Sequence, residues 1–134
     1  MDIRLIQLQK HGDERGALVA LEETRNVPFS IKRIYYLFAT KPEVRRGFHA
    51  HKKLKQLVIA VRGSCRFLLD DGNEKIELLL DNPAQGILLE SMVWREIYDF
   101  SEDCVLMVLA DALYDEADYI RDYKVFKTLT ESTI

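Results

Sequence analysis

The stretch Arg46-Gly47-Phe48-His49-Ala50-His51 decides how this chain can be interpreted. One residue separates its two histidines, and Gln56 and then Gly63 follow them. Because side chains alternate between the two faces of a β-strand, His49 and His51 should point to the same face, about 7 Å apart along the strand. The spacing therefore predicts a strand that presents a pair of histidines to one common site.

The spacing resembles the first motif of the cupins, where Gly-x-His-x-His precedes a polar residue and then a glycine. In metal-binding cupins the polar residue is glutamate, and a third histidine comes from a later strand. This chain has Gln56 at the first of these positions and, within Met92-Val93-Trp94-Arg95-Glu96, Arg95 at the second. An amide and a guanidinium make a poor cation site, because arginine stays charged and offers no lone pair. We therefore expect no metal and no cofactor, and histidines that are free to transfer protons.

Composition limits the classes of protein to which the chain can belong. Its 134 residues predict one domain over 1–134, and an apolar content of 48% supplies a core. The net charge of −3 argues against binding nucleic acid or a membrane surface. Cys65 and Cys104 lie in apolar runs and are expected to be buried thiols rather than a disulfide. With no signal peptide or membrane-length apolar stretch visible, the protein is expected to be soluble and cytoplasmic.

Short apolar segments alternate with turn residues along most of the chain. Besides the histidine strand, the predicted strands are Ile3–Leu8, Ala17–Glu22, Ile31–Phe38, Lys55–Val61, Cys65–Leu69, Lys75–Leu80, Ile87–Glu90, Val93–Tyr98 and Cys104–Ala110. Lys10–Gly16 is predicted to be a polar turn, and Asp70-Asp71-Gly72-Asn73 a hairpin turn. The period changes in Glu116–Leu129, which predicts a short helix or two. The fold class is therefore all-β: a cupin or jelly-roll barrel of antiparallel strands with a short C-terminal helical tail.

Several stretches together resemble one family, the sugar-nucleotide 3,4-ketoisomerases of the WxcM-like cupins. They are Pro28–Tyr36, Arg46–Lys53, Leu69–Gly72, Val93-Trp94 and Tyr114–Arg121. The resemblance implies a cofactor-independent isomerase that moves the ketone of dTDP-4-keto-6-deoxyglucose from carbon 4 to carbon 3. It also implies a homodimer, with the N-terminal strand exchanged between subunits. The product would feed an aminotransferase that makes 3-amino-3,6-dideoxy sugars for surface polysaccharides, such as the O-antigen of lipopolysaccharide or S-layer glycans.

This reaction removes the proton on carbon 3, passes through an enediol or enediolate, and delivers a proton to carbon 4. It needs an acid/base group near neutral pKa and stabilisation of the developing oxyanion. Histidine meets the first need best. The family resemblance places the base at His51, which leaves His49 as the second acid/base group or as a hydrogen-bonding partner of the sugar oxygens. The plainer interpretation of such a pair is a hydrogen-bonded arrangement without chemistry.

Arginines and aromatic residues complete the expected pocket. Arg33 and Tyr35 share one face of their strand with Leu37, and this face carries the polar groups. Arg46 could grip the diphosphate or stabilise the enolate. Trp94 could stack on thymine or the sugar, although a lone Trp in a sandwich is as often part of the core. The tail motif Tyr114–Arg121 is interpreted either as a lid or dimer contact near the site, or as a solvated helix start.

Two positions bear on the configuration at carbon 4. Several family members carry histidine directly after the Val-Trp pair, where this chain has Arg95, and the resemblance relates this position to gluco-forming enzymes. Arg15 resembles the galacto-forming members instead. Because an arginine is not a practical acid, Arg95 should orient the sugar rather than deliver a proton, and the gluco product is favoured.

Three rival functions remain open on the sequence. A sugar-nucleotide 3,5-epimerase would use the same enolate chemistry, usually in a longer chain with a tyrosine acid. A non-catalytic cupin that binds sugars needs no base, whereas an isomerase depends on His49 and His51. A metal-dependent dioxygenase is the weakest alternative, since Gln56 and Arg95 replace two of the metal ligands.

Overall fold

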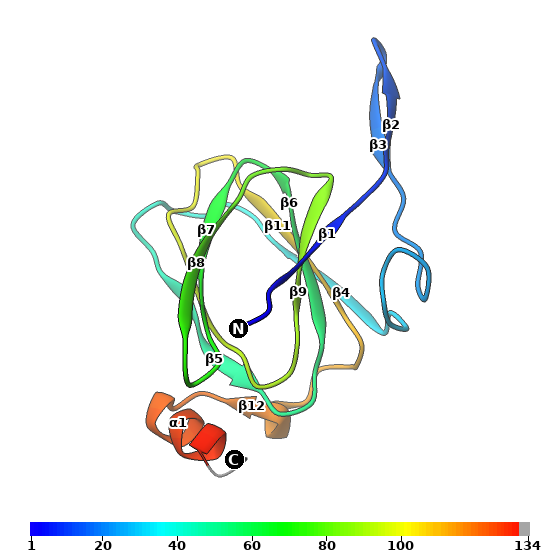
Figure 1. The fold of residues 1–134 in the computed structure, drawn as a ribbon. Coiled ribbons are helices and arrows are strands. Elements are labelled where there is room, and N and C mark those ends of the chain that lie inside the picture. Colours follow the sequence, from blue (N-terminus) through cyan, green and yellow to red (C-terminus); the bar gives the residue numbers. More distant parts are fainter. Residues whose placement is uncertain (132–134) are drawn as a thin grey trace.

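Two antiparallel β-sheets face one another in the computed structural model, which describes residues 1–131 (Figure 1). The first sheet has the order β1 (Arg4–Gln7), β9 (Gln85–Leu89), β6 (Gln56–Arg62), β11 (Val105–Ala110) and β4 (Arg33–Leu37). The second has the order β12 (Tyr119–Ile120), β5 (Arg46–His51), β10 (Trp94–Tyr98), β7 (Cys65–Asp70) and β8 (Lys75–Leu80). The predicted all-β class with antiparallel strands is therefore confirmed.

The main core lies between the two sheets, and the alternation of side chains along each strand builds it. On β6, Val58 and Ala60 point into this core, whereas Leu57 and Ile59 point to the outer face of the sheet. Phe67 of β7 meets the first pair from the opposite sheet and is fully buried. Because both faces of β6 are covered, its sequence is a continuous apolar run rather than an alternating one.

A second apolar cluster covers the outer face of the first sheet. The loop before β4 supplies Val27 and Phe29, which pack against side chains of β6, β9 and β11 such as Leu57, Leu88 and Leu109. Over β6, β9 and β11 this burial removes the outer face as a surface for solvent or for a ligand. The opening toward the site therefore has to lie elsewhere on the barrel.

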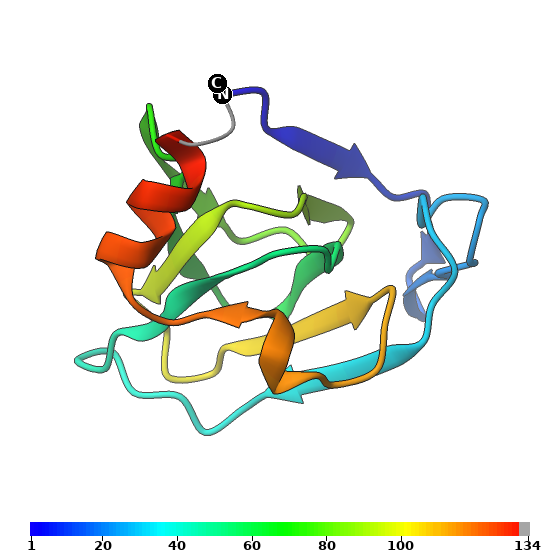
Figure 2. The ribbon, with the colours of Figure 1, turned by 90° about the horizontal axis from the view of Figure 1, so that it is seen from below.

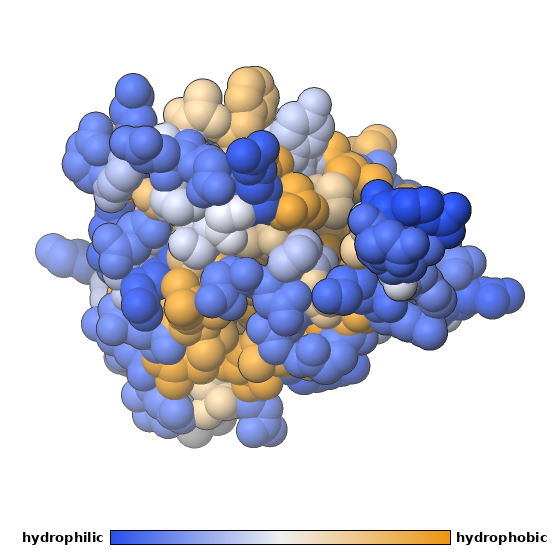
Figure 3. Space-filling view, turned by 90° about the horizontal axis from the view of Figure 1, so that it is seen from above, coloured by the Kyte–Doolittle hydropathy of each residue, from blue (hydrophilic) through white to orange (hydrophobic). Residues whose placement is uncertain are grey.

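The predicted polar turn over Lys10–Gly16 is wrong. This segment forms most of a hairpin, in which β2 (Lys10–Asp13) pairs with β3 (Gly16–Val19) and turns at Glu14 and Arg15. The hairpin projects away from the barrel (Figure 1), and its tip is hydrophilic (Figure 3). The side chains of β2 are all exposed, so no alternation of apolar and polar residues marked it as a strand.

The C-terminal tail has the predicted short helices, with a strand between them. A 3₁₀ turn, η1 (Glu116–Asp118), leads into β12, which pairs with β5, and α1 (Tyr123–Glu131) follows. The helix lies against the second sheet (Figure 2), where Phe126 packs with Trp94 and Ile120 in a third apolar cluster. The tail thus adds an edge strand to the sheet that carries the histidines.

Two smaller expectations can be compared with the structure. Cys65 and Cys104 are free and buried, as predicted. Within residues 1–131, no helix combines the length and apolar character needed to cross a membrane.

Truncating the buried contact of α1 should destabilise the protein. We expect Phe126→Ala to lower the free energy of unfolding by about 3–5 kcal/mol, because it removes a fully buried aromatic ring and leaves a cavity. Val125→Ala on the same helix is the control, since Val125 is exposed and its loss should cost less than about 0.5 kcal/mol. Urea denaturation of both variants measures the difference. Equal effects would show that α1 does not depend on this contact.

Candidate active site

Strand β5 contains a β-bulge that changes which of its side chains share a face. Gly47 and Phe48 both have positive φ, at 93° and 57° respectively. The register with β10 shifts at the same place, where Arg95 pairs with His49 and Glu96 with Gly47. A Cβ atom on Gly47 would lie 2.8 Å from the carbonyl oxygen of Arg95, so only glycine fits there. Arg46 and His49 are three positions apart, so on a regular strand their side chains would point to opposite faces. The extra residue of the bulge lets both line the same pocket.

The two histidines lie on one face, as predicted, with ring centroids 5.0 Å apart and nearly perpendicular planes. Nδ1 of His49 lies 3.1 Å from the carbonyl oxygen of Gly47. A carbonyl can only accept a hydrogen bond, so Nδ1 carries the proton of this ring and Nε2 its lone pair. His51 is 1% exposed, and its Nδ1 lies 3.2 Å from Oδ2 of Asp118. Nε2 of His51 has no hydrogen-bond partner within residues 1–131.

A buried guanidinium lies beside this pair. Arg95 is 2% exposed and donates hydrogen bonds to Oε1 of Gln56, at 2.5 Å, and to the carbonyl oxygen of Val93. The amide of Gln56 in turn donates to the hydroxyl of Tyr35 at 3.1 Å. In the described residues, no carboxylate forms an ion pair with Arg95. The four positions of the cupin motif therefore converge, with an amide and a cation beside two imidazoles.

This arrangement keeps both imidazoles neutral at pH 7. Burial, followed by the charge of Arg95, lowers the pKa of His49 to about 4 and that of His51 to about 3. Burial lowers the pKa of Arg95 only to about 10, so the guanidinium remains charged. Burial also raises the pKa of Tyr35, which keeps its hydroxyl protonated. The site thus combines two neutral bases with a fixed cation and a neutral hydroxyl donor.

His49 opens onto a pocket of about 410 Å³ with a cationic wall. Its lining residues are Arg33, Tyr35, Leu37, Arg46, Gly47, His49, Ile97, Tyr114, Tyr119 and Arg121. A cavity of about 30 Å³ shares His49 and Tyr35 with this pocket and extends to Gln56 and Arg95. His51 borders a different pocket, of about 220 Å³, which shares Arg33 and Tyr119 with the first. The two histidines therefore face different spaces on either side of Tyr119.

The tail motif forms one wall of the site. Tyr119 pairs with His51 across β12 and β5, and its ring lies 5.0 Å from that of His49 and 4.3 Å from that of His51. Arg121 stacks on Tyr119 at 4.1 Å and forms an ion pair with Glu116. The sequence predicts a role for this motif only as a whole, as a lid or dimer contact or as a solvated helix start. Its density of aromatic and charged residues was the signal, but the pairing of β12 with β5 is what brings them to the histidines.

Two residues expected to contact substrate lie away from the pocket. Trp94 is 3% exposed and packs against Tyr123 and Phe126 under α1. It precedes Arg95 on β10, and since Arg95 points into the barrel, Trp94 must point outward. Arg15 lies at the tip of the hairpin, where it forms an ion pair with Asp13, and it does not line the pocket within one chain.

A metal centre finds little support in the donor set. Among residues 1–131 there is no group of three or more His, Cys, Asp or Glu side chains arranged to hold a metal ion. At the two positions where metal-binding cupins have further ligands, the amide oxygen of Gln56 accepts from Arg95, and Arg95 contributes positive charge.

Comparison with known proteins agrees with this geometry. The family described as FdtA: WxcM-like, C-terminal matches residues 1–131. A TDP-4-oxo-6-deoxy-alpha-D-glucose-3,4-oxoisomerase from Aneurinibacillus thermoaerophilus is 57% identical over 127 residues, which are 95% of this chain and 91% of the relative.

Two solved structures give the same result. A 3,4-ketoisomerase from Helicobacter canadensis is 42% identical, with a TM-score of 0.94 over 98% of both chains. A histidine-to-asparagine mutant of the 3,4-ketoisomerase QdtA from Thermoanaerobacterium thermosaccharolyticum, in complex with TDP-4-keto-6-deoxyglucose, is 38% identical. Its TM-score is 0.95, over 97% of this chain and 94% of that one.

The fold and the site define a small cupin-like barrel with a histidine pair beside a buried arginine. The chain belongs to the WxcM-like family, as the sequence motifs predicted.

The lowered pKa values of the histidines should make stability depend on pH. Below about pH 6.5 the unfolded chain binds protons on these rings, whereas folded His49 does so only near pH 4. The free energy of unfolding is therefore highest above about pH 6.5 and decreases as the pH falls. Between pH 7 and pH 5 we expect each ring to account for a loss of about 2 kcal/mol. Urea denaturation should show a smaller loss for His49→Asn than for the wild type, and equal losses would contradict the assignment.

Proposed function

We propose that this chain is a sugar-nucleotide 3,4-ketoisomerase that converts dTDP-4-keto-6-deoxyglucose into its 3-keto isomer. The observation that carries the proposal is the neutral pair His49 and His51 beside an arginine-rich pocket, in a chain 57% identical to a named 3,4-oxoisomerase. The predicted class of enzyme, an isomerase, is confirmed by that relative and by the matching ketoisomerase structures.

His49 is our choice for the base that removes the proton on carbon 3. It borders the larger pocket, and its Nδ1–H donates to Gly47, which leaves the lone pair of Nε2 for the sugar. The same ring can return the proton to carbon 4 after the enediolate forms. The family resemblance favours His51 for this role, but that ring is almost fully buried and borders the other pocket.

Isomerisation also moves a proton between oxygens, because the hydroxyl on carbon 3 becomes a ketone and the ketone on carbon 4 a hydroxyl. His51 suits this second transfer, since its ring touches that of His49 edge-on and its Nε2 is unpartnered. The hydroxyl of Tyr35 already accepts from Gln56, so its own proton is available to stabilise the enediolate oxygen.

The diphosphate of the nucleotide is assigned to the arginines of the larger pocket. Arg33, Arg46 and Arg121 all line it, and guanidinium groups bind phosphate oxygens in bidentate fashion. Arg95 lies deeper, beside Gln56, where it orients groups rather than delivering a proton. We therefore retain the gluco configuration for the product.

The rival functions are less well supported. The matches reported above are to 3,4-ketoisomerases, which favours this reaction over 3,5-epimerisation. A binding module would not need two neutral imidazoles with free Nε2 atoms. In a metal enzyme, Arg95 would place a positive charge next to the metal ligands, and this charge would weaken binding of the metal ion.

The division of labour between the histidines can be tested by proton NMR of the sugar in deuterated water. We expect the wild type to convert dTDP-4-keto-6-deoxyglucose to a 3-keto product, whose couplings report the configuration at carbon 4. His49→Asn should lower kcat about 10²-fold or more and stop deuterium exchange at carbon 3, because the base is lost. His51→Asn should retain this exchange but slow product formation.

Unfolding curves of both variants serve as the control for folding. Exchange at the wild-type rate in His49→Asn would exclude His49 as the base. No conversion by the wild type would refute the proposed function.

We also propose that the chain acts as a homodimer with exchanged N-terminal segments. The hairpin of β2 and β3 extends away from its own barrel, and Leu18 on it is exposed (Figure 1). The outward-facing side chains Ile34 and Tyr36 on β4, and Phe38 directly after it, are each more than half exposed. Burial of these apolar groups against a second copy would stabilise the dimer and bring Arg15 toward the partner's pocket.

Light scattering at micromolar concentration should give twice the mass of the chain. Phe38→Lys should shift the protein toward monomer, because it places a charge in the proposed apolar contact. Val125→Lys on α1 is the control, since that exposed side chain lies outside the proposed interface, and it should remain dimeric. A monomeric wild type would contradict the proposal.

The cellular role follows from the reaction. A 3-keto sugar nucleotide is a substrate for transamination at carbon 3, so the product would feed an aminotransferase that makes a 3-amino-3,6-dideoxy sugar. We propose that this takes place in the cytoplasm and supplies surface polysaccharide, such as O-antigen or S-layer glycans.

A further inference from the structure

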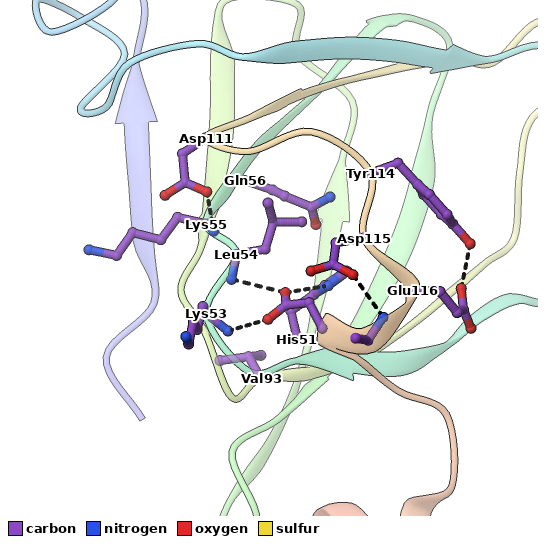
Figure 4. Close-up of polar contacts among 12 residues, drawn as sticks. His51, Lys53, Leu54, Lys55, Gln56, Val93, Asp111, Tyr114, Asp115 and Glu116 are labelled. Carbon is purple, nitrogen blue, oxygen red and sulfur yellow. Dashed lines mark hydrogen bonds and ion pairs between the residues drawn. The ribbon is translucent and has the colours of Figure 1, made fainter.

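One carboxylate joins the histidine strand to the loop that follows it. Oδ2 of Asp118 accepts hydrogen bonds from Nδ1 of His51 and from the amide of Leu54, both at 3.2 Å. Oδ1 accepts from the amide of Lys53 at 2.9 Å. Figure 4 shows the ring of His51 and the two amides gathered around this carboxylate. The hydrogen bonds from the two amides are enough to hold the carboxylate against the loop. The contact with His51 is not needed to hold it there.

The backbone on both sides of Asp118 is also held. Its carbonyl oxygen accepts from the amide of Lys52 at 3.0 Å, and its amide donates to the carbonyl oxygen of Asp115 at 3.1 Å. The next residue, Tyr119, pairs directly with His51. The carboxylate is therefore fixed relative to the imidazole by contacts that do not involve the imidazole.

We propose that Asp118 is a positioning residue for His51, an inference that rests on the proposed function. An ionised carboxylate only accepts hydrogen bonds, so it selects the tautomer of His51 with the proton on Nδ1 and the lone pair on Nε2. The pocket of His51 shares Arg33 and Tyr119 with the larger pocket, so a sugar bound where the two meet would bring its hydroxyl on carbon 3 to Nε2. Nε2 then takes the proton of this hydroxyl, as the O–H bond breaks and an N–H bond forms, and returns it to the oxygen on carbon 4. Asp118 stays ionised and stabilises the imidazolium between the two steps.

The other groups around His51 do not provide this negative charge. Within the described residues, Asp118 is the carboxylate that forms an ion pair with His51. The groups that act on the charge of the ring or contact it are His49 on β5, Arg33 on β4, Arg95 on β10, and Tyr119 and Arg121 in the tail. Lys53, Asp111 and Asp115 line the same pocket as His51. The carboxylates of Asp111 and Asp115 accept hydrogen bonds from the backbone amides of Lys55 and Ala117, and neither forms an ion pair with His51 in the described residues.

Asp118→Asn tests the proposal, since it keeps the size of the side chain and removes its charge. We expect kcat to fall about 10-fold or more with little change in KM, while deuterium exchange at carbon 3 continues, as in His51→Asn. The double variant His51→Asn/Asp118→Asn should be no slower than His51→Asn alone, because both changes remove one function. Asp111→Asn is the matched control and should leave kcat close to the wild-type value. Oδ1 of Asp111 accepts from the amide of Lys55 at 3.0 Å, so this carboxylate also holds the loop after β5.

A second measurement needs no substrate. In protein labelled with ¹⁵N-histidine, Nδ1 of His51 should have the shift of a protonated nitrogen and Nε2 that of an unprotonated one, and Asp118→Asn should change this pattern. The proposal is overturned if kcat of Asp118→Asn stays within about threefold of the wild type, if the losses of the two single variants add in the double variant, or if wild-type His51 carries its proton on Nε2. Absence of turnover in the wild type, with the expected NMR pattern, would refute the proposed function alone.

Discussion

The buried charge of Arg95 is the constraint on which the rest of the site depends. A guanidinium at 2% exposure, without a carboxylate partner in the described residues, is costly unless its N–H groups are satisfied. Gln56 and the carbonyl oxygen of Val93 satisfy three of them. Burial, and after it the field of this cation, lowers the pKa of both imidazoles and keeps them unprotonated. The same charge makes the cupin position unfavourable for a metal ion.

His49 and His51 are residues of the same type on one strand, but their surroundings differ. Both lie on β5 and both are neutral, yet the carbonyl oxygen of Gly47 holds one ring and the carboxylate of Asp118 holds the other. A neutral acceptor suits His49 as a base that faces the pocket. An anionic acceptor suits His51, because it favours a ring that becomes charged during a proton relay. Two residues of one type on the same strand can thus take different roles.

The proposed dimer would extend the site beyond one chain. Arg15 lies on a hairpin that leaves its own barrel, so in the proposed dimer its resemblance to galacto-forming enzymes would bear on the partner's pocket rather than on its own. Arg95 lies inside the barrel of the same chain as the histidines. The two positions associated with the configuration at carbon 4 would therefore meet only when two copies assemble.

The sequence by itself determined the strands with clear alternation, the shared face of His49 and His51, and the polar face of β4 with Arg33 and Tyr35, because these depend on residues close together in the chain. It missed the β2–β3 hairpin, whose exposed side chains have no apolar period. Other features follow from the packing of the whole chain: the bulge that turns Arg46 toward His49, the place of Trp94 under α1, and the approach of Tyr119 and Asp118 to the histidines. Each of these depends on pairing between strands far apart in sequence, and local patterns carry no information about that pairing.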